Sequence, residues 1–220
     1  MCFGPVASFS ASALLASFGT LILRNIRARR ELWFAAFPAL FSFQQLIEGA
    51  LWLTLKNGHP ESLIRPLSLA FLLFAYGLWP VFCPASVYAI EYDPKRKRAL
   101  RLMILLGVVT STYLLSFIFT HPVSAVILNC SIRYHTFVTG APWFAGIYVA
   151  ATILPYFISS HRAILIFGIP NLAFCAIAYF FYNWAFVSVW CFFAAVLSLT
   201  LYFFLRRLHH QPLLPLPLKH

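Results

Sequence analysis

The side chains best suited to chemistry lie in Phe41–Trp52, read FSFQQLIEGALW, within a long apolar run. This stretch carries Gln44, Gln45 and Glu48 inside two helical turns. On a helix, residues three and four apart share a face, so the three polar ends would converge. Glu48 is the carboxylate that falls neither in a loop nor at a segment end. Because a charge inside an apolar run is costly in lipid, Glu48 is the first candidate for a functional residue.

A second set of reactive side chains is predicted at the same depth. Cys2 precedes the first apolar segment, His135 lies in a long connection, and Cys191 lies about two turns inside the last segment. Cysteine, histidine and carboxylate are the ligands that zinc and copper prefer. Cys2, Glu48, His135 and Cys191 therefore form a candidate site for a zinc or copper ion. Alternatively, Cys2 and Cys130 would form a disulfide in an oxidising periplasm.

Aromatic residues indicate a wall for a cavity near Glu48. Tyr76, Trp79 and Cys83 share one helical face, and Pro80 is expected to bend that helix. Trp52 falls on the same face as Glu48. The candidate residues for binding a small ligand are Gln44, Gln45, Glu48, Trp52, Tyr76 and Trp79.

The composition places these residues in a membrane. Of the 220 residues, 62% are hydrophobic and only 10% are charged. A soluble domain carries roughly 25% charged residues, because its surface faces water. The net charge of +11 does not indicate a nucleic-acid surface, since the basic residues cluster beside apolar runs. We expect a lipid bilayer as the surroundings and no nucleic acid as a partner.

Seven apolar segments are long enough to cross a bilayer, which takes about 20 helical residues. The sequence therefore predicts an all-α, polytopic membrane helix bundle with seven transmembrane helices. The segments are 7–25, 31–56, 63–91, 98–120, 141–160, 162–182 and 184–206.

The basic residues predict the orientation. Counting the connections alternately, 13 of the 16 Lys and Arg fall on one side, and Lys56, Arg65 and Arg133 on the other. Positive charge favours the cytoplasmic side, so the N-terminus is predicted outside and the C-terminus in the cytoplasm. Glu48 would then lie in the outer half of the bundle. We expect residues 1–208 to form the transmembrane domain and 209–220 a flexible, proline-rich cytoplasmic tail.

The long outer connection, 121–140, is expected to hold structure of its own. Val126–Leu128 and Ile132–Tyr134 flank a polar centre, a pattern that indicates a short hairpin or cap. A shift of 132 residues brings Arg30, Pro38 and Trp52 onto Arg162, Pro170 and Trp184. This correspondence suggests a 3+1+3 parallel repeat, with chance alignment of membrane helices as the alternative.

The opening Met1-Cys2-Phe3, followed by Ala7-Ser8-Phe9-Ser10-Ala11, resembles a family of uncharacterised bacterial multi-pass membrane proteins whose chains begin MCFSA. Gln44–Gly49, Ser131–Tyr134 and Phe186–Phe193 look like other recurring motifs of that family. Gly4 stands where the family usually has serine. The resemblance implies a multi-pass protein of the bacterial inner membrane and carries no established activity with it.

Three functions fit these observations. The first is a small-ligand binding or transport protein with an outward-facing polar cavity around Glu48. The second is a metal-dependent membrane enzyme that uses Cys2, Glu48, His135 and Cys191. The third is a sensor or assembly subunit in which the polar cluster only orders the bundle. A substitution of Glu48 by glutamine separates the first from the third, because only the first predicts a loss of binding.

Overall fold

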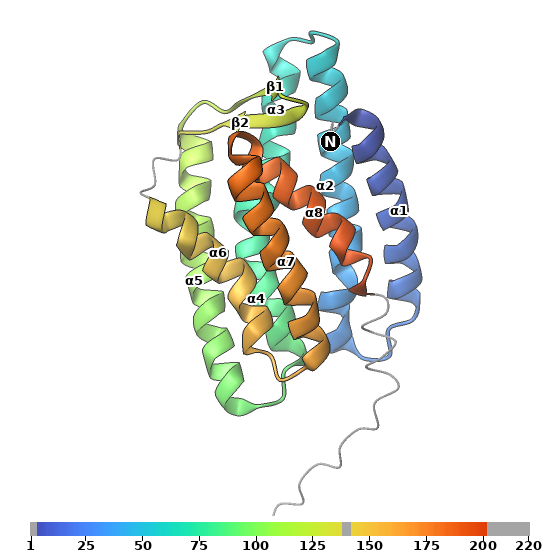
Figure 1. Cartoon of the computed structure of the whole chain (residues 1–220), viewed down its shortest axis with the longest axis vertical. Coiled ribbons are helices and arrows are strands. Elements are labelled where there is room, and N and C mark those ends of the chain that lie inside the picture. The colour runs from blue at the N-terminus through green and yellow to red at the C-terminus, as the bar shows by residue number, and fades with distance from the viewer. Residues whose placement is uncertain (1–3, 138–141, 202–220) are drawn as a thin grey trace, which may run out of the picture.

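The computed structural model describes residues 4–137 and 142–201, and within these ranges the chain forms seven helical segments and one β-hairpin (Figure 1). The third segment is built from α3, a π-helical turn at Leu73–Leu78 and α4, which follow one another without a break. The helices are α1 (Pro5–Arg24), α2 (Leu32–Lys56), α3 (Glu61–Leu72), α4 (Trp79–Ile90), α5 (Pro94–Thr120), α6 (Pro142–Ile158), α7 (Arg162–Phe181) and α8 (Phe186–Ser198).

The predicted all-α bundle of seven helices is confirmed in its element count, and the observed ends lie near the predicted ones. Residues 202–206 of the last predicted segment, and the predicted tail 209–220, lie outside the described residues. Among the described residues, four helical segments are long and apolar enough to cross a membrane: Pro5–Arg24, Glu61–Ile90, Pro94–Thr120 and Arg162–Phe181. The chain is therefore an apolar helical bundle of the membrane type. The predicted repeat stays a prediction.

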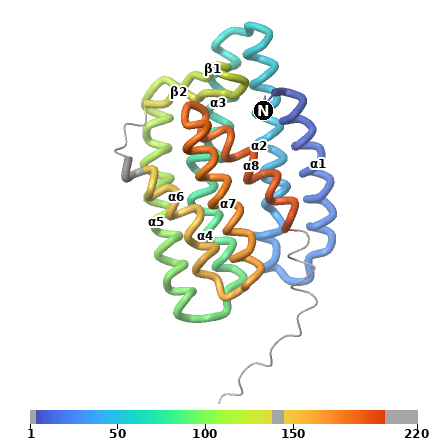
Figure 2. The backbone as a smooth tube through the Cα atoms, viewed as in Figure 1, coloured from blue at the N-terminus to red at the C-terminus, as the bar shows by residue number. Residues whose placement is uncertain are grey.

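Basic connections gather at one end of the bundle and the hairpin at the other (Figure 1). The α1–α2 connection carries Arg27, Arg29 and Arg30, and the α4–α5 connection leads into Lys95–Arg98. The hairpin lies across the opposite end, beside the α2–α3 connection and the start of α1 (Figure 2). The bundle thus has one cationic end and one end covered by β structure.

The first two helices pack closely because small residues face one another. The Ser12 hydroxyl donates to the Ser42 carbonyl at 2.9 Å, and the Ser42 hydroxyl donates to the Ser12 carbonyl at 2.8 Å. A Cβ added at Gly19 would lie 3.0 Å from the backbone nitrogen of Ala39. Small residues at such contacts let membrane helices approach, which fixes α2 and its polar residues against α1.

The hairpin consists of β1 (Ser124–Leu128) and β2 (Ser131–His135), paired antiparallel with Leu128 opposite Ser131. Asn129 and Cys130 form the turn with φ values of 47° and 58°, as a two-residue hairpin turn with both central residues left-handed requires. Ala125 and Ile132 are buried in one cluster with Leu51 and Trp52 of α2. The predicted short hairpin cap is confirmed, and it forms a dry contact over the end of α2.

The π-helical turn before Pro80 opens α3–α4 to its neighbours. Pro80 has no backbone N–H, so a helix cannot continue through it with all carbonyls bonded internally. The Ala75 carbonyl accepts from the Tyr148 hydroxyl at 2.5 Å, and the Gly77 carbonyl accepts from the Ser111 hydroxyl at 2.8 Å. Side chains of α5 and α6 thus satisfy this irregular backbone and hold α4 in place.

At the cationic end, Glu91 ties the α4–α5 connection to the α6–α7 connection. Its side chain is 1% exposed and accepts from the Ser160 hydroxyl at 2.6 Å and the Ser160 backbone N–H at 2.7 Å. The backbone N–H groups of Tyr92 and Asp93 also donate to it. Burial alone would raise the pKa of Glu91, but these four hydrogen bonds outweigh burial and hold the pKa below its ordinary value of 4.5.

Candidate functional site

Glu48 is buried in the bundle and bonded to neutral groups. Its side chain is 2% exposed. The Ser188 hydroxyl of α8 donates to Oε1 at 2.5 Å, and the Gln45 amide Nε2 donates to Oε2 at 3.2 Å. Among the described residues, no Lys, Arg or His forms an ion pair with Glu48. A carboxyl group so placed has hydrogen bonds but no compensating charge, which is costly in an apolar interior.

Gln44 connects this carboxyl group to an aromatic stack. The Trp79 indole N–H donates to the Gln44 Oε1 at 2.9 Å, which joins α4 to α2. The Trp79 ring stacks on Phe41 with centroids 4.1 Å apart and runs nearly parallel to Phe37 at 5.8 Å. The indole has one donor, so this hydrogen bond adds to the stacking in fixing the orientation of the buried Trp79 ring.

Four buried polar atoms near this stack have no hydrogen-bond partner among the described residues. Two belong to α2, the Gln44 Nε2 and the Gln45 Oε1. The other two belong to β2, the Ser131 hydroxyl and the Tyr134 hydroxyl. Buried polar atoms are nearly always paired with protein, water or ligand, because an unpaired one costs about 1–3 kcal/mol. These atoms make α2 and β2 the elements that carry the candidate site.

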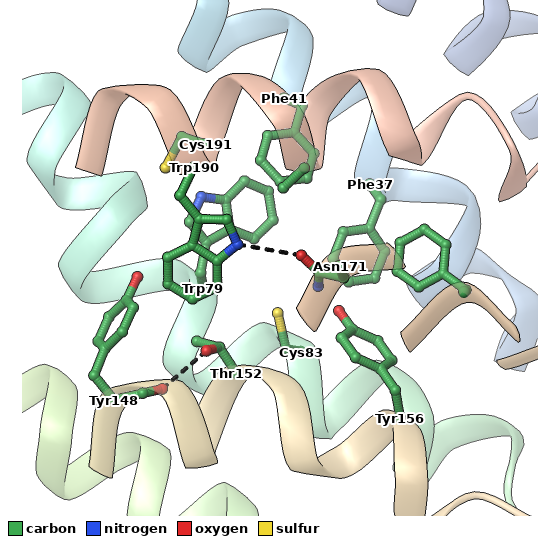
Figure 3. A pocket seen from close by; sticks show the side chains of 12 residues that line it. Phe37, Phe41, Trp79, Cys83, Tyr148, Thr152, Tyr156, Asn171, Trp190 and Cys191 are labelled. Carbon is green, nitrogen blue, oxygen red and sulfur yellow. Dashed lines mark hydrogen bonds between the residues drawn. The ribbon is translucent and has the colours of Figure 1, made fainter. Parts of the chain in front are cut away.

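An aromatic cavity lies beneath the layer of polar side chains formed by Gln44, Gln45 and Glu48 (the polar layer). It lies between α2, α4, α6, α7 and α8 (Figure 3). About 30 Å³ of it is open to the centres of water molecules, room for about two of them. Its lining consists of rings, two thiols and a few neutral polar groups, with no charged residue. The lining residues are Phe37, Phe41, Trp79, Cys83, Tyr148, Thr152, Tyr156, Phe167, Asn171, Trp190, Cys191 and Ala194.

Two hydrogen bonds orient polar groups of the cavity. The Trp190 indole N–H donates to Asn171 Oδ1 at 3.2 Å, and the Thr152 hydroxyl donates to the Tyr148 carbonyl at 2.8 Å (Figure 3). The remaining lining consists mostly of aromatic rings, together with Cys83 and Cys191.

Trp79 and Cys191 interact with the polar layer and also line the cavity. Trp79 lines the cavity with its ring and bonds to Gln44 through its indole N–H. The Cys191 thiol lines the cavity and lies within electrostatic range of Glu48 and next to the Gln44 amide. Glu48 itself does not line the cavity, and Trp79 and Cys191 connect its surroundings to the cavity wall.

The predicted ligand-binding residues are partly brought together. Gln44, Gln45, Glu48 and Trp79 form the connected cluster described above. Tyr76 is not a lining residue of the cavity, but its ring meets that of the lining residue Tyr148 edge to face at 6.5 Å. Trp52 lies elsewhere, since it is packed under the hairpin and the Lys56 ammonium lies 5.9 Å from its ring centroid.

The predicted metal ligands are not brought together within the described part of the chain. His135 is exposed, whereas its neighbour Tyr134 faces the bundle and stacks on Phe71 with centroids 4.8 Å apart. Successive residues of a strand point to opposite faces, so these two cannot both face Glu48. Cys2 and its predicted disulfide with Cys130 lie outside the described residues. The ranges 4–137 and 142–201 contain no group of three His, Cys, Asp or Glu that could hold a metal ion.

Ser188, Tyr134 and Asn171 are site residues that sequence reasoning missed. Ser188 belongs to a stripe of small residues on α8, a pattern that usually signals close helix packing. Tyr134 was adjacent to the histidine that drew attention as a metal ligand. Asn171 follows Pro170 within an otherwise apolar run, and a lone amide in such a run was the one signal that pointed to it.

Comparison with known proteins gives a family but no activity. A family model described as "Family of unknown function (DUF6629)" matches residues 1–213, so the chain belongs to that family. The resemblance to a family without an established activity is thereby confirmed. No curated protein and no solved structure matches the chain.

Proposed function

We propose that this member of a family of unknown function is an integral membrane protein that binds a small ligand inside its helix bundle. Gln44, Gln45 and Glu48 would be the polar determinants, and the cavity beside Trp79 would hold the ligand. The observation that carries the proposal is a buried carboxyl group without an ion pair among the described residues, on the same helix as Gln44, which bonds to the cavity-lining Trp79.

A purely structural role for the cluster fits these contacts less well. If Glu48 only ordered the bundle, its neighbours would be expected to use their hydrogen-bonding capacity on one another. Instead, the Gln45 Nε2 donates to Glu48, whereas the Gln45 Oε1 has no hydrogen-bond partner among the described residues. This unused group favours a binding role over an ordering role. Transport is the form of binding that would use the irregular π-helical turn at Leu73–Leu78, because irregular helices form the substrate sites of many transporters.

The proposal is tested by adding small probes to the purified full chain in detergent and recording tryptophan fluorescence. Trp79 and Trp190 line the cavity, so occupancy is expected to change their emission. Probes of two or three heavy atoms suit the available volume: methylammonium chloride, methanol and sodium formate. At least one should give a saturable change that Glu48→Gln weakens while the thermal unfolding midpoint is kept.

The matched control is Glu61→Gln, which removes an exposed carboxylate at the start of α3. This variant should respond to the probes as the unsubstituted chain does. If no probe gives a saturable signal, or if Glu48→Gln changes only the unfolding midpoint, the ligand-binding proposal is wrong. The cluster would then act only in assembling the bundle.

The same proposal includes an orientation in the bacterial inner membrane, with the transmembrane domain spanning residues 1–208 and the tail in the cytoplasm. The basic connections at one end of the bundle support it. A membrane-impermeant maleimide should label His59→Cys in the α2–α3 connection of cells with a permeabilised outer membrane. Lys95→Cys, at the start of α5, should be labelled only after the inner membrane is opened. The reverse pattern would invert the orientation.

A further inference from the structure

We infer that the interior site takes a small ammonium cation, meaning ammonium itself or a primary amine of two or three heavy atoms. The inference rests on the proposed binding function and names the chemical class of the ligand. Three features of the site carry it: the charge around the cavity, the chemistry of its walls and its size.

The charge around the cavity favours a cation. No lysine, arginine or histidine lines it, and the adjacent carboxyl group of Glu48 forms no ion pair with the described residues. A cation in the cavity would supply the countercharge that Glu48 lacks, since Cys191 lines the cavity and lies within electrostatic range of Glu48. In an interior of low dielectric constant, opposite charges attract each other over such distances far more strongly than they do in water.

The walls of the cavity also suit a cation. Seven of the lining residues are aromatic: Phe37, Phe41, Trp79, Tyr148, Tyr156, Phe167 and Trp190. Aromatic faces carry partial negative charge and attract ammonium groups, most strongly where water is excluded. An anion placed among these rings would meet the same faces with repulsion.

The size of the cavity limits the ligand. Room for about two water molecules accommodates about two heavy atoms without movement of the walls. A ligand that small binds weakly even in an ideal site, and a dissociation constant on the order of 10 mM is the tightest that its atom count permits. The experiment must therefore use concentrations up to about ten times that value.

The test compares methylammonium, methanol and formate, which are close in size and differ in charge, on the full chain in detergent. Tryptophan fluorescence is recorded, with sodium chloride holding the ionic strength constant. We expect methylammonium to give a saturable change with half-saturation in the millimolar range, and methanol and formate to give none. Ammonium chloride should compete with methylammonium.

Two variants assign the effect to the groups named above. Glu48→Gln keeps the shape of the side chain and removes its charge, so the affinity for methylammonium should fall at least tenfold. Phe41→Leu removes a ring face and should weaken methylammonium binding several-fold, which supplies a second measurement should Glu48→Gln fail to fold. Glu61→Gln, the exposed control, should leave the affinity unchanged.

The outcomes separate this inference from the proposed function. If methanol or formate binds and Glu48→Gln abolishes that binding, the site is a ligand site but the ammonium inference is wrong. If methylammonium binds with equal affinity to the unsubstituted chain, Glu48→Gln and Phe41→Leu, the inference is also overturned. If none of the three probes gives a saturable signal, the inference and the proposed function fail together.

Discussion

Ser188 donates a hydrogen bond to Glu48 at 2.5 Å, although 140 positions separate the two residues in the chain. This contact joins the last described helix to the second and places the buried carboxyl group between them. Ser188 is 4% exposed and Glu48 is 2% exposed, so water cannot readily replace either partner. The bond requires that α8 packs against α2 as described, so removing it by substitution tests this arrangement of the bundle.

Ser188→Ala should lower the free energy of unfolding by about 1–3 kcal/mol, because it leaves Glu48 Oε1 buried without its donor. The matched control is Ser198→Ala on the same helix, where the hydroxyl bonds only to the Ala195 carbonyl one turn away. That loss should be well below 1 kcal/mol, since the carbonyl belongs to the helix itself. Denaturation in mixed micelles measures both values. Equal losses would mean that Ser188 does not support Glu48.

Gly107→Ala should prevent normal assembly of α4 against α5. A Cβ at Gly107 would lie 1.9 Å from the Pro80 carbonyl oxygen, which is backbone and cannot rotate away. Gly146→Ala is the control, because a Cβ there meets nothing within 4 Å. Alanine favours the helix over glycine by about 1 kcal/mol, so the control should be neutral or stabilising. Yield after purification and the unfolding midpoint report the difference, and a folded, stable Gly107→Ala chain would contradict this packing.

Tyr148→Phe should loosen the π-helical turn, because it removes the donor to the Ala75 carbonyl at 2.5 Å. Hydrogen bonds between membrane helices contribute about 0.6 kcal/mol on average and up to about 1.7. We expect a loss of stability in that range, together with faster amide hydrogen exchange in Leu73–Leu78. Tyr179→Phe, on an exposed tyrosine of α7, should change neither quantity. Unchanged exchange in Tyr148→Phe would show that the turn does not depend on this bond.

Lowering the pH should weaken the hydrogen bonds by which Glu91 holds the α4–α5 connection to the α6–α7 connection at the cationic end. Because the folded-state pKa of Glu91 lies below 4.5, its contribution to stability is complete above that pH and is lost as the pH falls through the folded-state value. Glu91→Gln should therefore be less stable than the unsubstituted chain at neutral pH, and the difference should shrink on acidification below about 4.5. Thermal unfolding across this pH range measures the difference. A constant difference would mean that the carboxylate form does not hold Ser160.

Much of the architecture could be predicted from local sequence pattern. Long apolar segments bounded by basic residues give the seven helices, because a span in lipid must satisfy its own backbone hydrogen bonds. The polar cluster on α2 was also predictable, since Gln44, Gln45 and Glu48 are close enough in sequence for helix geometry alone to converge them. The hairpin followed from the residues that flank its polar centre.

The partners of that cluster were decided by the tertiary structure. Nothing local in the sequence says which helix face meets Glu48, so Ser188 emerged only when α8 packed against α2. The choice of Tyr134 over His135 depended on which face of β2 turned toward the bundle, a matter of strand placement by one residue. The aromatic cavity needed five helices at once. Helical periodicity acts within a few residues, so the sequence by itself determined the helices and the polar cluster on α2. Long-range packing depends on complementary surfaces, so only the tertiary structure decided which helices and side chains meet that cluster.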